Sequence, residues 1–142
     1  MRYYGTGEIR IKFALKITGA SSLGVGSWLY LKLGNTSNGR LYVRFEWDSA
    51  SSLIKINGGT QVGASGTISV VTYVSDNSLI LGEIVFTPNV DVIFNIAGST
   101  TTISTNVPGD TDALDYIMQI IEPSGVSGTD MYIYDYIFVM EF

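Results

Sequence analysis

Strict two-residue alternation of apolar and polar side chains is the feature of this sequence that most constrains its fold. From Glu8 to Thr18, large apolar residues stand at every odd position and mostly charged residues at the even ones. Successive side chains of a β-strand point to opposite faces of a sheet, whereas a helix repeats every 3.6 residues. The segment therefore predicts a strand with one buried face. The same alternation returns at Trp28–Leu33 and Arg40–Asp48.

Further strand-like segments follow at regular intervals between turn-forming residues. They are Leu53–Asn57, Thr67–Val74, Ser78–Phe86, Val90–Ala97, Thr100–Ser104, Tyr116–Ile121 and Met131–Phe142. About ten strands with short turns are typical of all-β sandwiches and barrels. The run Asn57-Gly58-Gly59 is predicted to be a turn, and the acidic start of Asp110–Met118 indicates the one short helix. No linker or repeat divides the 142 residues, so we expect a single domain over residues 1–142.

Two of these segments, Ser78–Phe86 and Met131–Phe142, are apolar on both faces. In the last one, Tyr132, Tyr134 and Tyr136 share a face. A strand of this kind is usually central in a sheet and covered twice. The second face is either core beneath a loop or the contact surface of a neighbouring subunit.

The composition removes most familiar catalytic arrangements. The chain has no cysteine and no histidine. It therefore offers no thiolate nucleophile, no imidazole base and no thiolate or imidazole metal ligand. We expect a protein that is not an enzyme.

The charge is polarised along the chain. All eight basic residues lie within the first 55 positions against three acidic ones, a net of +5, and the remaining residues carry ten acids and no base. The two halves pair either within one molecule or between a basic edge of one copy and an acidic edge of the next. Arg40 and Arg44 are the candidate interface cations, together with the three C-terminal tyrosines. A pI near 4.4 argues against nucleic-acid binding.

No apolar run reaches the length of about 20 residues needed for a membrane-spanning helix. The N-terminal residues also lack the apolar core of a signal peptide. We expect no membrane insertion, and localisation stays open, with a virion or extracellular surface favoured.

Aromatic residues supply a candidate sugar-binding platform. Trp28, Tyr30 and Tyr42 fall on the predicted outward faces of their strands, and Trp47 is a further candidate. Flat amphipathic rings on the surface of a sandwich suit ligand binding. The same residues would be core if those strands are covered on both faces.

Two groups of carboxylates could carry chemistry. Asp110, Asp112 and Asp115 offer hard oxygen ligands of the kind that calcium prefers. An exposed acidic loop or a helix N-terminus explains them as well. Glu46 and Asp48 lie two apart on one strand and could flank a sugar as acid and nucleophile, or simply form a solvated face.

The strand pattern resembles the concanavalin A-like lectin/glucanase jelly roll, including laminin G-like domains. The resemblance rests on Ile9–Ile17, Ser27–Leu33, Asn38–Val43 and the closing segment Met131–Val139. It implies a two-sheet antiparallel jelly-roll sandwich, often glycan-binding and sometimes calcium-dependent. Laminarinase-type relatives carry Glu-x-Asp-x-x-Glu on one strand. Glu46 and Asp48 match its first two acids, but the third position is Ser51.

These observations give two expectations for function. The first is a non-enzymatic structural subunit of a larger assembly, such as a virion or extracellular surface protein, that associates with itself or with other subunits. The alternative is a lectin-like carbohydrate-binding module, with calcium as the one cofactor considered.

Overall fold

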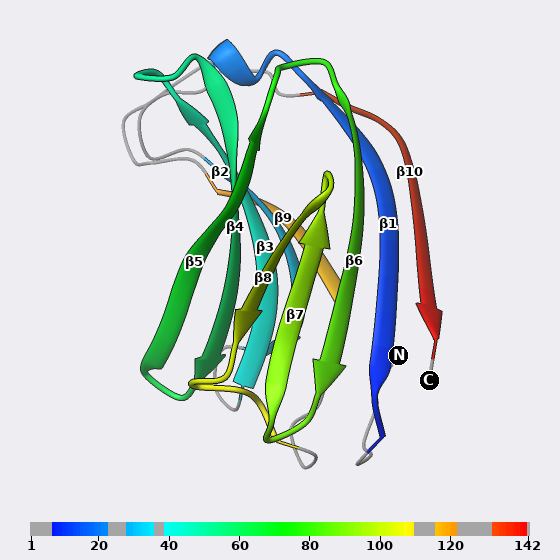
Figure 1. Ribbon diagram of the computed structural model, residues 1–142. Coiled ribbons are helices and arrows are strands. Elements are labelled where there is room, and N and C mark those ends of the chain that lie inside the picture. Colours follow the sequence, from blue (N-terminus) through cyan, green and yellow to red (C-terminus); the bar gives the residue numbers. More distant parts are fainter. Residues whose placement is uncertain (1–6, 23–27, 36–38, 110–115, 122–131, 142) are drawn as a thin grey trace.

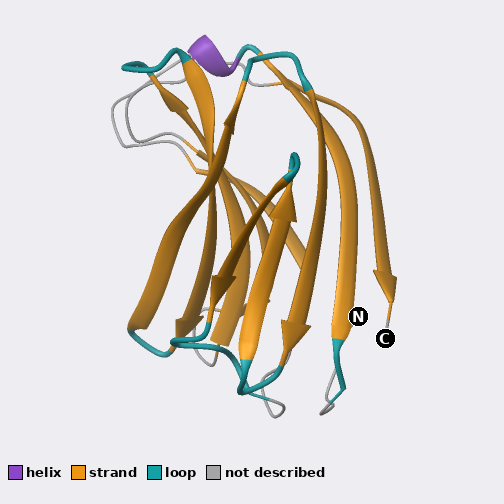
Figure 2. Ribbon diagram, viewed as in Figure 1, coloured by secondary structure: helices purple, strands orange, loops and turns teal. Residues whose placement is uncertain are grey.

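The computed structural model describes residues 7–22, 28–35, 39–109, 116–121 and 132–141, and these residues form an antiparallel β-sandwich of two layers (Figures 1 and 2). The strands are β1 (Ile9–Thr18), β2 (Trp28–Asn35), β3 (Gly39–Asp48), β4 (Leu53–Val62), β5 (Ser65–Val74), β6 (Leu79–Thr87), β7 (Asp91–Ile96), β8 (Ser99–Ile103), β9 (Tyr116–Ile121) and β10 (Tyr132–Glu141). One 3-10 turn, η1 (Ala20–Ser22), follows β1. The predicted two-sheet antiparallel all-β sandwich is confirmed.

Within the described residues, each layer holds five strands. Sheet I has the order β10-β1-β6-β7-β8, and sheet II has the order β5-β4-β3-β2-β9. Every strand pairing is antiparallel. Consecutive strands such as β2, β3, β4 and β5 are neighbours in one sheet, whereas β1 is far in sequence from its partners β6 and β10.

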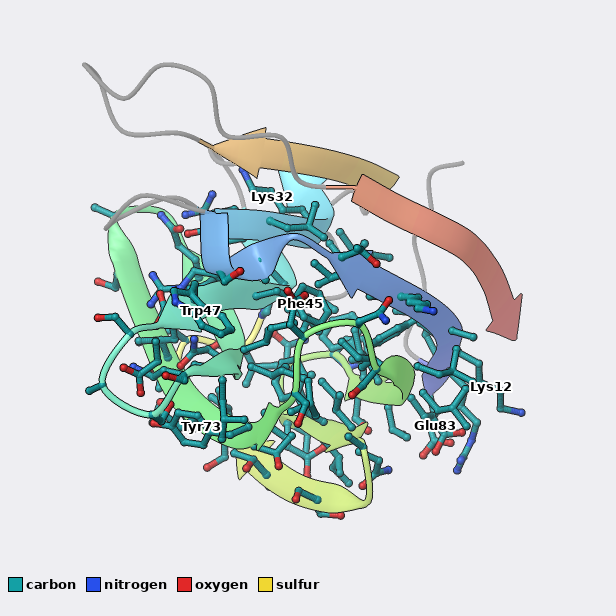
Figure 3. All side chains as sticks on the ribbon, turned by 90° about the horizontal axis from the view of Figure 1, so that it is seen from above. Lys12, Lys32, Phe45, Trp47, Tyr73 and Glu83 are labelled. Atoms are coloured by element: carbon teal, nitrogen blue, oxygen red, sulfur yellow. The ribbon has the colours of Figure 1, made fainter. Side chains whose placement is uncertain are left out.

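The core lies between the two sheets and follows the alternation of the sequence. The odd-numbered residues of β1 from Ile9 to Ile17 are buried, and the even-numbered ones are exposed or half-buried. Sheet II contributes Leu29, Leu31 and Phe45 to the same core. The Phe45 ring lies at the centre of Figure 3 and meets the Phe13 ring edge to face, with 6.4 Å between ring centroids. Burial of one face of each sheet supplies the main driving force for folding.

Strand β4 continues through the predicted turn at Asn57-Gly58-Gly59, so that expectation was wrong. At both glycines, the missing side chain leaves room for an aromatic ring that packs against the backbone. A Cβ on Gly58 would lie 2.5 Å from Cδ2 of Phe94, and a Cβ on Gly59 would lie 2.5 Å from Oη of Tyr42. The actual turn comes at Gly63, whose φ is +56°, between the paired residues Val62 and Ser65.

Two other local expectations fail. Tyr116–Met118, the end of the predicted helix, belongs to strand β9, and the start of that helix lies outside the described residues. Strand β10 is an edge strand of sheet I rather than a central one. Strand β6 is central, but Leu79 and Leu81 on its outer face are 63% and 58% exposed.

Among the described residues, we found no helix with the length and hydrophobicity required to cross a membrane.

Candidate functional site

The outer face of sheet II combines four cationic side chains of β2, β3 and β4 with several aromatic ones. We define the β2–β5 face as the outward side chains of these four strands. It includes Tyr30, Lys32, Arg40, Tyr42, Arg44, Glu46, Asp48, Lys55, Asn57, Gly59, Ile68, Val70 and Tyr73.

The antiparallel register places cations and aromatic rings in alternation. Lys32 on β2 lies directly opposite Tyr42 on β3, and Tyr30 lies opposite Arg44. The two tyrosine rings meet at 72° with 5.3 Å between centroids. Lys32 Nζ lies 4.9 Å from the centre of the Tyr30 ring, and Arg40 Cζ lies 5.3 Å from that of Tyr42. These distances are typical of cation–π interactions, so each tyrosine ring has a positively charged group over its face.

Tyr30 and Tyr42 are each only 8% exposed, so the expectation of an open stacking platform made by these two rings is wrong. The Tyr42 ring packs over Gly59, whose missing side chain leaves room for it. Burial and the neighbouring Tyr30 raise the pKa of Tyr42, although Arg40 and Arg44 act in the opposite direction. The two tyrosines therefore form a packed layer at the base of the face, and Lys32, which is 7% exposed, belongs to the same layer.

The other two predicted platform residues are placed differently. Trp47 packs against the core on the opposite side of sheet II and is separate from the β2–β5 face. Trp28 lies two residues before Tyr30 on β2 and pairs with Glu46 of β3, and its side chain lies outside the described residues.

Tyr73 is an exposed aromatic residue on this face that the sequence analysis missed. It is 42% exposed on β5, opposite Lys55 of β4. Ile68 and Val70 of the same strand are 43% and 44% exposed. Figure 3 labels Tyr73 and Lys32 on sheet II, and Lys12 and Glu83 on the far side of the molecule, on sheet I. No motif marks Tyr73, because the pairing of β4 with β5 decides what it faces.

Glu46 organises the polar part of the face. Its carboxylate forms ion pairs with Arg44 Nη2 at 3.0 Å and Lys55 Nζ at 3.1 Å. Asn57 Nδ2 donates a hydrogen bond to Glu46 Oε1 at 3.3 Å, and Asn57 is itself buried. Three donors from two strands therefore converge on one carboxylate, which fixes the directions of their side chains.

Asp48, the other predicted carboxylate of this strand, serves the turn after β3. It accepts hydrogen bonds from the Ala50 backbone N–H at 3.0 Å and from Ser51 Oγ at 2.9 Å. The Ser51 side chain and then the Ala50 backbone lower the pKa of Asp48. Ser51 therefore caps Asp48 where the laminarinase-type pattern has a third acid, and both predicted carboxylates are engaged by neighbouring groups.

Two predicted groups lie beyond what the structure describes. Asp110, Asp112 and Asp115 are outside the described residues, and the described part of the chain contains no cluster of three acidic ligands for a metal. Tyr132, Tyr134 and Tyr136 belong to β10, whose side chains are also outside the described set. The calcium site and the tyrosine interface therefore stay predictions.

The charge polarisation is resolved only in part by contacts within the molecule. Among the described ion pairs, Arg10 with Glu83, at 3.5 Å, joins the basic half to the acidic half. The pairs of Arg10 with Glu8 and of Glu46 with Arg44 and Lys55 stay within the basic half. The outer face of sheet I also carries a shallow hollow lined by Lys12, Leu81, Glu83 and Asn95.

Comparison with known proteins identifies the fold. No family model and no curated protein sequence matches the chain. An alginate lyase from Alteromonas sp. 272 aligns with 99% of this chain and 75% of its own, with a TM-score of 0.59 and 9% identity. The Caenorhabditis elegans galectin LEC-6 aligns with 98% of this chain and 88% of its own, with a TM-score of 0.54 and 13% identity. The binding domain of botulinum neurotoxin DC, in complex with SialylT, aligns with 94% of this chain and 32% of its own, with a TM-score of 0.56 and 14% identity. At these identities the likeness concerns the fold alone, which is the jelly-roll, concanavalin-like β-sandwich.

Proposed function

We propose that this protein binds carbohydrate on the β2–β5 face of sheet II. The observation that carries the proposal is the combination, on one sheet face, of an exposed tyrosine with oriented side-chain donors. Tyr73, Lys55 and Glu46 form one row across β5, β4 and β3, and Arg44 and Asn57 converge on the same carboxylate. Sugars present both apolar ring faces and many hydroxyls, so they are recognised by an aromatic surface beside fixed polar groups.

The similar solved structures agree with this proposal and leave the assembly expectation without support. They include a galectin and a neurotoxin binding domain in complex with SialylT. Self-association through the charged interface stays a prediction. Light scattering across concentration and salt tests it, because exposed ion pairs between copies weaken as salt screens them.

Catalysis needs its own test, because an alginate lyase and a polysaccharide lyase of family 18 have a similar fold. The expectation that the chain is not an enzyme stays a prediction. Incubation with alginate, followed by measurement of polymer length, tests it. Shortening of the polymer by the folded protein, and not by the same preparation after heat denaturation, would overturn it.

The direct test of carbohydrate binding is retention on a glycan array, followed by titration of the best ligand. Tyr73→Ala should weaken binding about tenfold, which corresponds to about 1.4 kcal/mol. The matched control is Leu81→Ala, which also shortens an exposed apolar side chain but on sheet I. It should leave the affinity unchanged. A folded protein that retains no glycan, or equal losses in both variants, would count against the proposal.

A further inference from the structure

We propose that the β2–β5 face selects glycans that carry carboxylate groups, with Arg40 and Lys32 as the groups that recognise the acid. This inference rests on the proposed function, since it names the ligand class of the same face. If the protein binds neutral sugars as well as acidic ones, this inference is wrong and the proposed function still stands.

The charge balance of the face has the opposite sign to that of the chain. Four cations point outward from β2, β3 and β4, namely Lys32, Arg40, Arg44 and Lys55. The acids described on the same strands and face are Glu46 and Asp48, so the face carries a net charge of +2. The whole chain carries −5. A cationic face on an acidic protein attracts anions locally and repels an extended polyanion elsewhere.

The arginines and lysines of this face differ in their surroundings. Arg44 and Lys55 share the carboxylate of Glu46. Arg40 forms no ion pair with any described residue, which distinguishes it from Arg44; the Nε atoms of both arginines are buried and have no hydrogen-bond partner in the described part of the chain. The Arg40 guanidinium lies over the Tyr42 ring instead. A buried donor without an acceptor is costly, and a ligand oxygen that reached this group would offset that cost.

Lys32 and Arg40 are neighbouring cations on this face. Lys32 lies opposite Tyr42, and Arg40 stands two residues before Tyr42 on β3, which makes it one of the two diagonal neighbours of Lys32, with Arg44 as the other. Diagonal neighbours in an antiparallel pair are about 7–8 Å apart. Burial, and then the positive charge of Arg40, lower the pKa of Lys32. A carboxylate between the two groups would relieve this repulsion and take two charge-assisted hydrogen bonds.

The exposed arginine of sheet I provides an internal contrast. Arg10 Nη2 lies 2.8 Å from Glu8 Oε1, and Arg10 Nη1 lies 3.5 Å from Glu83 Oε1. Its charge is already balanced by two carboxylates of the same chain. Arg10→Gln therefore removes the same charge from the molecule as Arg40→Gln, but from the opposite face and without a role in the proposed site.

The experiment compares acidic ligands with their neutral counterparts. One pair of probes is an oligouronate and the same oligomer with its carboxyls reduced to alcohols, and a second pair is a sialylated oligosaccharide and its desialylated form. The wild type should bind at least one acidic probe tenfold or more tightly than its neutral counterpart, and added salt should reduce the difference. The two pairs distinguish uronate from sialate as the source of the carboxylate.

The variants assign this preference to Arg40. Arg40→Gln should bring the acidic-to-neutral ratio close to one while affinity for the neutral probe is kept, and Arg40→Lys should retain part of the preference. Arg10→Gln should leave the ratio unchanged.

Equal affinity for acidic and neutral probes would overturn the inference alone, whereas no binding of either would also remove the proposed function. Equal losses in Arg10→Gln and Arg40→Gln, or equally tight binding of polyglutamate or nucleic acid, would show non-specific electrostatic attraction without recognition by Arg40 and would also overturn the inference.

Discussion

Replacing Gly59 by alanine should displace the Tyr42 ring and destabilise the protein. An ideal Cβ at position 59 would lie 2.5 Å from Tyr42 Oη and still nearer to the ring carbons Cζ and Cε2. The ring cannot move freely, because Tyr42 is 8% exposed and packs edge to face on Tyr30. Overpacking of this kind costs about 1–3 kcal/mol, and loss of the aromatic pair alone is about 0.5–1.5 kcal/mol. We therefore expect the free energy of unfolding to fall by about 1–3 kcal/mol.

The same substitution should have the opposite effect once the ring is absent. In a Tyr42→Ala background the new Cβ has room, and a strand glycine costs about 0.5–1 kcal/mol relative to alanine. Gly59→Ala should then raise the free energy of unfolding by about that amount. The coupling energy of the double-mutant cycle should accordingly be about 1.5–4 kcal/mol.

Urea denaturation of the four proteins measures this coupling, provided that the slope with denaturant stays constant across the set. Effects that add to within about 0.5 kcal/mol would refute the reasoning, because they would mean that Gly59 and Tyr42 do not share the same space.

Three further predictions concern the core, pH and the buried cation. Gly58→Ala should cost about 3 kcal/mol, because its Cβ would lie 2.5 Å from the fully buried Phe94 ring; urea denaturation should show that Phe94→Leu relieves part of this loss. Asp48→Asn should lower the free energy of unfolding at pH 7 but not at pH 2. The folded state lowers the pKa of Asp48 below its ordinary value of 3.8, so the ionised carboxylate stabilises the fold above pH 3.8 and loses that contribution as the pH falls. An equal loss at both pH values would refute this. Lys32→Met should raise the free energy of unfolding at pH 7, because burial lowers the pKa of Lys32 and its charge is therefore unfavourable in the folded state. The same variant should bind acidic glycans more weakly. A less stable variant would show that the contacts of the ammonium group outweigh its desolvation.

The strands themselves could be predicted from local pattern. Alternation placed β1, β2 and β3 to within a few residues, and β9 matches its predicted bounds. Strand β4 was cut short because Gly58 and Gly59 carry the local signature of a turn. Their role is visible only when Phe94, from the other sheet, and Tyr42, from the next strand, are seen to occupy the space above them.

The candidate site was predicted only in part, because a site depends on which strands are neighbours. The sequence placed Tyr30, Tyr42, Arg40 and Arg44 on outward faces, and all four lie on the β2–β5 face. It could not show that the two rings are buried as a packed layer, nor that Tyr73 is the described aromatic residue exposed there.

By itself, the sequence determined a histidine-free and cysteine-free all-β sandwich with a basic first half and an acidic second half, because alternation and composition are local properties of the chain. Only the tertiary structure decided that β2, β3, β4 and β5 lie side by side and bring cations of the basic half onto one outer face. That choice depends on the register and order of strands, which are set by how both sheets bury their apolar faces against each other.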